Sequence, residues 1–137
     1  MEEKNQKPKT VLKEEGEVER VVFIDGSGAR LDGTGSAIAW ICPTTKERMV
    51  ERIPGLTNNQ AEYRAFLGAL TALLDGTSAT FFSDSELLCY QFRGDYRVRD
   101  PELTDLMKQI RSLINTKRLR ISLQWVPRSR NSAGKLL

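Results

Sequence analysis

The sequence contains no histidine among its 137 residues. This absence excludes a histidine-based catalytic triad, a histidine-ligated zinc ion and a histidine proton shuttle within the chain. Cysteine is scarce as well. Cys42 and Cys89 each lie in an apolar stretch, which predicts buried thiols and argues against a disulfide framework or a thiolate zinc site. Any chemistry must therefore rest on carboxylates, lysines or a bound metal ion.

Long apolar runs are also missing. No stretch approaches the roughly 18 apolar residues of a membrane span, and the first 20 residues lack the apolar segment of a secretion signal. Hydrophobic residues make up 39% of the chain and charged residues 28%, which is typical of a globular domain. We expect a cytoplasmic monomer that does not contact membranes.

The pattern predicts a charged flexible tail over residues 1–18 and one domain over residues 19–137. The predicted strands cover residues 20–24, 33–42, 46–54, 79–83 and 119–126. The predicted helices run from Thr57 or Asn58 to about Leu74, from Ser85 to about Phe92, and onward from Pro101; Arg130–Leu137 is expected to begin a last helix. This order predicts an α/β fold in which a mixed sheet, an antiparallel meander plus parallel strands, is flanked by helices.

Three carboxylates stand at the edges of these elements. Asp25 and Asp84 each follow a short run rich in β-branched or aromatic residues, and Glu62 lies on the first helix. A carboxylate in such a place is costly to desolvate unless it is paired, hydrogen-bonded or bound to a cation. The three side chains are therefore candidates to converge on Mg²⁺, which prefers oxygen ligands, in a metal-dependent phosphoryl-transfer site.

Charge is unevenly distributed along the chain. Residues 86–137 carry 11 Lys/Arg and 5 Asp/Glu, a net charge of +6, whereas residues 1–85 have a net charge of −3. A basic half beside an acidic cluster suits a polyanion held over metal ions. A solvated charged surface explains the charge equally well.

Four segments, taken together, resemble the ribonuclease H type 1 family: IDGSG, TNNQAEYRAFLGAL, SDSELLCYQ with GDYRVRD, and WVPRSRN. Their order and spacing also match, and the resemblance covers residues from about Val21 to Leu137. It implies a five-stranded mixed sheet with an acidic centre. It also implies hydrolysis of the RNA strand of RNA–DNA hybrids with two Mg²⁺ or Mn²⁺ ions.

The resemblance also implies roles for individual residues. Asp25 matches the ligand shared by both metals, and Glu62 and Asp84 match further ligands. Asn58 and Asn59 match an amide pair that reaches the minor groove of the hybrid, although helix capping is an alternative role. Ser83 and Ser85 flank Asp84 as candidate hydrogen-bond donors to that ligand. Further substrate candidates are Gly26, Ser27 and Gly28 near the RNA backbone, Ser85 beside Asp84, and Tyr96, Arg97 and Arg99 on phosphates. The last three are equally well interpreted as surface residues, and Trp125 is expected in the core.

The chain departs from the family at its C-terminal motif. The family usually has a fourth carboxylate four residues after the Asn of that motif, and counting from Asn131 gives Lys135. Three outcomes follow: a three-carboxylate site that still binds both metals, a catalytic Lys135 that replaces one metal as a fixed charge, or a protein that binds hybrids without cutting them. Asn131 either supplies an amide oxygen to the site or caps the last helix. Two lesser departures are Glu86, in place of a common Gln, and the loop 29–33.

Two functional hypotheses carry most weight. The first is a metal-dependent endoribonuclease acting on RNA–DNA hybrids. The second is a non-cleaving module of the same fold that binds hybrids or double-stranded RNA. Another nuclease or a structural subunit is a third possibility, because a fold alone does not fix chemistry.

Overall fold

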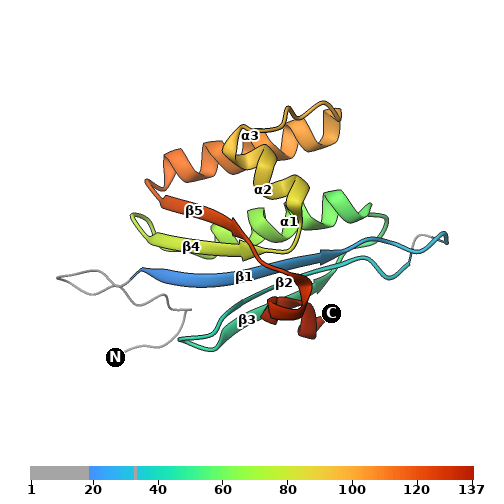
Figure 1. Cartoon of the computed structure of the whole chain (residues 1–137), viewed down its shortest axis with the longest axis horizontal. Helices are drawn as coiled ribbons and strands as arrows, with labels where there is room; N and C mark the ends of the chain where they lie inside the picture. The colour runs from blue at the N-terminus through green and yellow to red at the C-terminus, as the bar shows by residue number, and fades with distance from the viewer. Residues whose placement is uncertain (1–18, 33) are drawn as a thin grey trace.

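A computed structural model describes residues 19–32 and 34–137. The charged tail expected for residues 1–18 lies outside these residues. The described chain forms a five-stranded sheet in the order β3-β2-β1-β4-β5 (Figure 1). The pairs β1–β2 and β2–β3 are antiparallel, whereas β1–β4 and β4–β5 are parallel. The predicted mixed sheet, with its meander and parallel strands, is confirmed.

The elements have the following bounds. The strands are β1 (Arg20–Ser27), β2 (Ala37–Cys42), β3 (Glu47–Arg52), β4 (Ser78–Ser83) and β5 (Arg120–Trp125). The α-helices are α1 (Asn58–Thr71), α2 (Glu86–Arg93) and α3 (Pro101–Thr116), and two 3-10 turns follow, η1 (Arg128–Arg130) and η2 (Ser132–Leu136). In Figure 1 α3 lies at the top of the view, and the C-terminal turns lie beside β1 and β2.

The core lies between the sheet and the helices. Alternate residues of β1 and β4, such as Val22, Ile24 and Phe81, are buried against the inner face of α1. Phe66 of α1 meets the ring of Phe81 edge to face at 5.1 Å. This packing fixes α1 across β1, and it thereby fixes the height at which Glu62 meets the strand.

Local sequence signals set the helix ends. Thr57 accepts a hydrogen bond from the N–H of Gln60, whose side chain in turn accepts from the N–H of Thr57. Gly94 ends α2 in the left-handed conformation, with φ of 88°. Asp100 caps α3, with Pro101 in the first turn.

Several predicted boundaries were wrong. Pairing with β2 extends β1 to Ser27, so Asp25 lies inside the strand and not after it. The second strand starts at Ala37, not at residue 33, after a loop in which Gly35 has a φ of 89°. The first helix ends at Thr71, not Leu74.

Two C-terminal predictions were also wrong. Residues 128–136 form 3-10 turns, not the start of an α-helix. Trp125 is 45% exposed and not in the core. It is the last residue of β5, which lies at the edge of the sheet formed by the described residues, and its indole N–H donates to the carbonyl of Asp84 at 3.2 Å.

None of the helices in the described part of the chain combines the length and the apolar character that a membrane crossing requires.

Candidate active site

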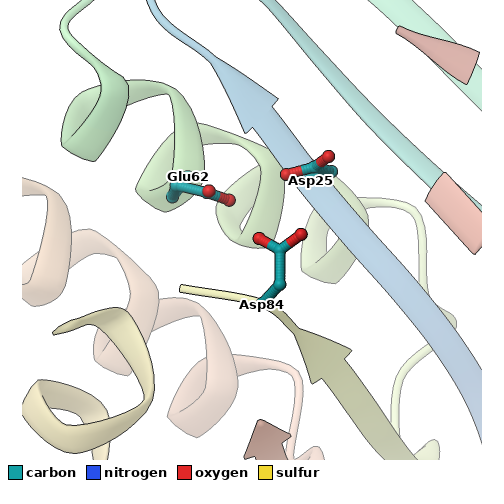
Figure 2. Close-up of side chains that lie close together, drawn as sticks. All are labelled: Asp25, Glu62 and Asp84. Carbon is teal, nitrogen blue, oxygen red and sulfur yellow. The ribbon is translucent and has the colours of Figure 1, made fainter. Parts of the chain in front are cut away.

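Three carboxylates from three elements meet at one edge of the sheet. Asp25 comes from β1, Asp84 directly follows β4, and Glu62 comes from the second turn of α1 (Figure 2). Because β1 and β4 are parallel neighbours, their carboxyl ends open at the same edge. One carboxylate oxygen from each residue lies within 4.8 Å of the others. The convergence predicted for these acids is therefore present.

A close approach of strand and helix brings Asp25 and Glu62 together. The N–H of Gly26 donates to Asp25 Oδ1 at 2.9 Å and to Glu62 Oε1 at 3.1 Å. A Cβ atom on Gly26 would lie only 2.2 Å from the carbonyl carbon of Ala61. Position 26 therefore requires glycine, and the strand can touch α1 only because that side chain is absent.

Mutual repulsion and burial dominate the electrostatics of the cluster. Burial, and then the Asp25 and Asp84 charges, raise the pKa of Glu62 to about 9. Burial and the Asp84 charge raise the pKa of Asp25 to about 6. Without a cation, Glu62 therefore keeps its proton at neutral pH.

The third acid is short of partners. Asp84 Oδ2 is buried and accepts no hydrogen bond from the described residues, and Arg128 Nε lies 3.9 Å from it, which is too long for a hydrogen bond. A buried carboxylate oxygen without a donor is unfavourable. Three clustered carboxylates, one of them with a buried oxygen to which no described residue donates a hydrogen bond, fit a hard divalent cation such as Mg²⁺ or Mn²⁺.

A cavity of about 640 Å³ opens beside the acids. It is lined by Asp25, Gly26, Ser27, Asn58, Glu62, Arg128, Asn131, Gly134, Lys135 and Leu137. Of these described lining residues, only Asp25 and Glu62 are acidic, and Arg128 and Lys135 bring two positive charges to the same wall. The cavity therefore combines a negatively charged edge with positively charged side chains.

Gly134 and Lys135 both line the cavity from the C-terminal turn. A Cβ atom on Gly134 would lie 3.0 Å from Asp25 Oδ2, and Lys135 is exposed. The catalytic role expected for Lys135 stays a prediction.

The substrate candidates near α1 occupy two environments. Asn58 lines the cavity, and its Oδ1 accepts from the N–H of Gly28 at 2.7 Å. Asn59 is exposed and is not among the lining residues. Thr57 caps the helix, so the alternative capping role does not fall to either asparagine.

Three other polar candidates make structural hydrogen bonds. Ser85 caps α2 by accepting from the N–H of Leu88, and its own N–H donates to the buried Ser83 hydroxyl. Asn131 is 1% exposed; its amide donates to the carbonyl of Ile24 at 2.8 Å and accepts from the N–H of Ala133. Asn131 therefore caps the last turn, the simpler of its two predicted roles.

Tyr96, Arg97 and Arg99 lie on the loop between α2 and α3. All three are exposed, and none lines the cavity. The Tyr96 ring rests against Tyr90, with the ring centroids 4.9 Å apart. The phosphate contacts predicted for these three residues would therefore form on a surface outside the acidic cavity.

Sequence reasoning missed Arg128. Within the described part of the chain, it both lines the cavity and forms an ion pair with an acid of the cluster. The sequence feature that could have pointed to Arg128 is its position in WVPRSRN, shortly after β5, the strand that neighbours β4.

The fold and the acidic edge define a ribonuclease H-like protein. The chain belongs to the family described as reverse transcriptase-like, which matches residues 24–137. Among known sequences, the bifunctional protein Rv2228c of Mycobacterium tuberculosis is 33% identical over 119 residues, covering 81% of this chain. The match covers 32% of that protein, so the chain spans about a third of its length.

Solved structures agree with this assignment. The N-terminal RNase H domain of Rv2228c has a TM-score of 0.75 and 31% identity, over 87% of this chain and 90% of that one. RNase H1 from the archaeon Halobacterium salinarum has a TM-score of 0.74 and 26% identity, over 88% and 94%. LC11-RNase H1, solved in complex with an RNA/DNA hybrid, has a TM-score of 0.74 and 26% identity, over 86% and 93%. The resemblance to ribonuclease H type 1 is confirmed.

Proposed function

We propose that this protein is a metal-dependent endoribonuclease that hydrolyses the RNA strand of RNA–DNA hybrids. The observation that carries the proposal is the convergence of the carboxylates of Asp25, Glu62 and Asp84 beside a cavity with a positively charged wall. The hybrid-bound LC11-RNase H1 supports the choice of substrate, because it shares this fold.

Asp25, Glu62 and Asp84 are the proposed ligands of two Mg²⁺ or Mn²⁺ ions. When bound, such ions polarise the scissile phosphate and lower the pKa of a coordinated water. Asp25 is the proposed shared ligand, since the N–H of Gly26 links it to Glu62 and the Asp84 charge acts on it directly. Glu62 must release its proton on loading, because its pKa lies near 9 without a cation.

The chain also offers groups for the RNA strand. Because Asn58 Oδ1 already accepts from Gly28, the amide N–H groups of Asn58 remain for an acceptor such as a 2′-hydroxyl. Backbone groups of Gly26, Ser27 and Gly28 can approach the strand closely because two of the three residues lack a side chain. Lys135 contributes a fixed positive charge that stabilises phosphate oxygens at the cavity wall.

One observation favours a second candidate, a non-cleaving module that binds hybrids or double-stranded RNA. The cavity wall that faces the acids carries Arg128 and Lys135 and no further carboxylate from the described residues. A cation there attracts phosphate but repels a metal ion. The expected monomeric state and cytoplasmic location stay predictions.

Cleavage of an end-labelled RNA–DNA hybrid, titrated with Mg²⁺ and Mn²⁺, separates the two candidates. We expect cutting of the RNA strand alone, and its loss in Asp25→Asn. Faster cutting in Lys135→Asp would make the lysine a handicap, whereas slower cutting would make it a working substitute. Hybrid binding without cleavage at any metal concentration would replace the nuclease with the binding module.

A further inference from the structure

Arg128 and Asp84 form a weak ion pair at the edge of the cavity. Arg128 Nε lies 3.9 Å from Asp84 Oδ2; the arginine side chain is 90% exposed and the aspartate side chain 5% exposed. Within residues 19–32 and 34–137, no group donates a hydrogen bond to this aspartate oxygen that could replace the attraction. The arginine is therefore easy to displace, because its charge is well solvated, whereas the buried carboxylate requires a cation.

The backbone of Arg128 is held in place even though its side chain is exposed. Before it, the N–H of Val126 donates to the carbonyl of Ser83 at 2.9 Å. After it, the buried Asn131 donates to the carbonyl of Ile24. The turn is thus tied to β4 and β1, the strands that position Asp84 and Asp25. The backbone of Arg128 is therefore anchored beside the acidic edge, and its guanidinium starts from a position near both Asp84 and the cavity.

We propose that Arg128 is an exchangeable counter-ion: it neutralises Asp84 before metal loading and then binds a phosphate of the nucleic acid in the cavity. A divalent cation at the three acids competes with Arg128 for Asp84 and repels its guanidinium. The planar fork of the freed arginine suits two phosphate oxygens. The phosphate half of this proposal rests on the function proposed above.

The exchange predicts opposite effects of one substitution on two ligands. In Arg128→Gln, Mg²⁺ alone should bind about 2- to 5-fold more tightly, because Mg²⁺ no longer has to displace the arginine from Asp84. The gain is small because an exposed ion pair contributes little free energy. The same variant should bind an RNA–DNA hybrid about 10-fold more weakly in Ca²⁺, since glutamine cannot make the charge-assisted hydrogen bonds of arginine to a phosphate. Arg128→Lys should keep the metal affinity of the parent and recover only part of the hybrid affinity.

Arg130→Gln is the matched control, because Arg130 is exposed on the same turn and does not line the cavity. Metal binding is measured by calorimetry without nucleic acid, and hybrid binding by fluorescence anisotropy in Ca²⁺. Circular dichroism checks that both variants keep the fold of the parent. Arg130→Gln should leave metal affinity unchanged and weaken hybrid binding far less than Arg128→Gln.

The metal-binding and hybrid-binding measurements together distinguish failure of the proposed Arg128 exchange from failure of the proposed function. Unchanged metal and hybrid affinities in Arg128→Gln would overturn the exchange, and so would weakening of both. If the parent binds Mg²⁺ but no hybrid, the proposed function fails together with the phosphate half. Tighter metal binding in Arg128→Gln would then still support the pairing with Asp84.

Discussion

At the residue scale, one backbone amide and one proton hold the acidic edge together before a metal binds. The N–H of Gly26 serves both Asp25 and Glu62. Burial and two neighbouring charges keep Glu62 protonated well above its ordinary pKa of 4.5. The metal-free site therefore concentrates negative charge, and protonation relieves part of the repulsion. Such perturbed carboxylates are characteristic of functional sites.

The raised pKa of Glu62 predicts how the stability of the metal-free protein changes with pH. The unfolded chain releases this proton near pH 4.5, whereas the folded chain keeps it to about pH 9. Between these values the folded state binds more protons, so the free energy of unfolding falls as pH rises. Glu62→Gln removes this contribution. We expect its Tm to exceed that of the parent by at least about 5 °C at pH 8, with little difference at pH 4.

Thermal denaturation from pH 4 to pH 9, with a metal chelator present, measures this effect. Glu51→Gln, at an exposed position on β3, is the control and should follow the parent at every pH. Adding Mg²⁺ at pH 8 should stabilise the parent more than Glu62→Gln, because the variant has lost a proposed ligand. Parallel Tm profiles for the parent and Glu62→Gln would contradict the burial and repulsion inferred for this carboxylate.

The three carboxylates of the site could be predicted from the sequence, but the residues around them could not. Asp25 and Asp84 follow apolar runs, and Glu62 falls on a helical pattern, so strand and helix periodicity sufficed to place them. Gly134 and Arg128 owe their positions to the 3-10 turns, and those depend on the tertiary hydrogen bond from Asn131 to Ile24. A count of residues along the chain cannot anticipate such a contact.

At the element scale, the contact between β1 and α1 decides the geometry of the site. Gly26 lies against the backbone of Ala61, and Gly28 lies against the backbone of Asn58. These two approaches bring the first turns of α1 beside the end of β1. Packing therefore requires glycine at two of the positions that are proposed to lie near the RNA strand.

This contact predicts opposite outcomes for two Gly→Ala substitutions. Gly26→Ala places a Cβ atom 2.2 Å from backbone carbon and forces β1 away from α1. We expect a loss of roughly 3 kcal/mol or more, near the upper end of single-residue effects. Gly68→Ala lies inside α1, and its nearest neighbour would be Ile38 Cδ1, at 3.6 Å. It should stabilise the protein by about 0.5–1 kcal/mol through helix propensity.

Urea denaturation of both variants tests this pair of effects. The two substitutions add the same methyl group, so the chemical change is matched and only the position differs. If Gly26→Ala unfolds at the urea concentration of the parent, then β1 and α1 do not touch as described. A Gly68→Ala variant that loses stability would instead point to crowding between α1 and β2.

Element types followed from the sequence better than element ends did. Capping signals at Thr57, Gly94 and Pro101 located helix boundaries because these residues act locally. Strand ends depended on partners that the sequence does not reveal, as the extension of β1 to Ser27 opposite Ala37 demonstrates. The prediction that Trp125 lies in the core was wrong for the same reason. The alternation of apolar and polar residues along β5 does not reveal that this strand lies at the edge of the sheet.

At the scale of the whole molecule, positive charge gathers in the second half of the sequence, whose net charge is +6. The described part of this half includes the cavity wall with Arg128 and Lys135, and the exposed loop with Arg97 and Arg99. Binding to a nucleic acid backbone weakens with salt in proportion to the number of phosphates contacted. The salt dependence of hybrid affinity therefore tests whether the loop belongs to the same binding surface as the cavity.

Two double variants that remove the same net charge make this test quantitative. Arg97→Gln with Arg99→Gln should lower the magnitude of the slope of log Kd against log salt by about 1–2, roughly one for each phosphate that the variant no longer neutralises. Arg48→Gln with Arg52→Gln changes exposed arginines on β3, at the other end of the sheet order. This control should leave the slope of the parent nearly unchanged. Anisotropy titrations of a labelled hybrid in Ca²⁺, from low to moderate salt, give both slopes. Equal reductions in the two variants would mean that total charge attracts the hybrid and that the loop contacts no phosphate.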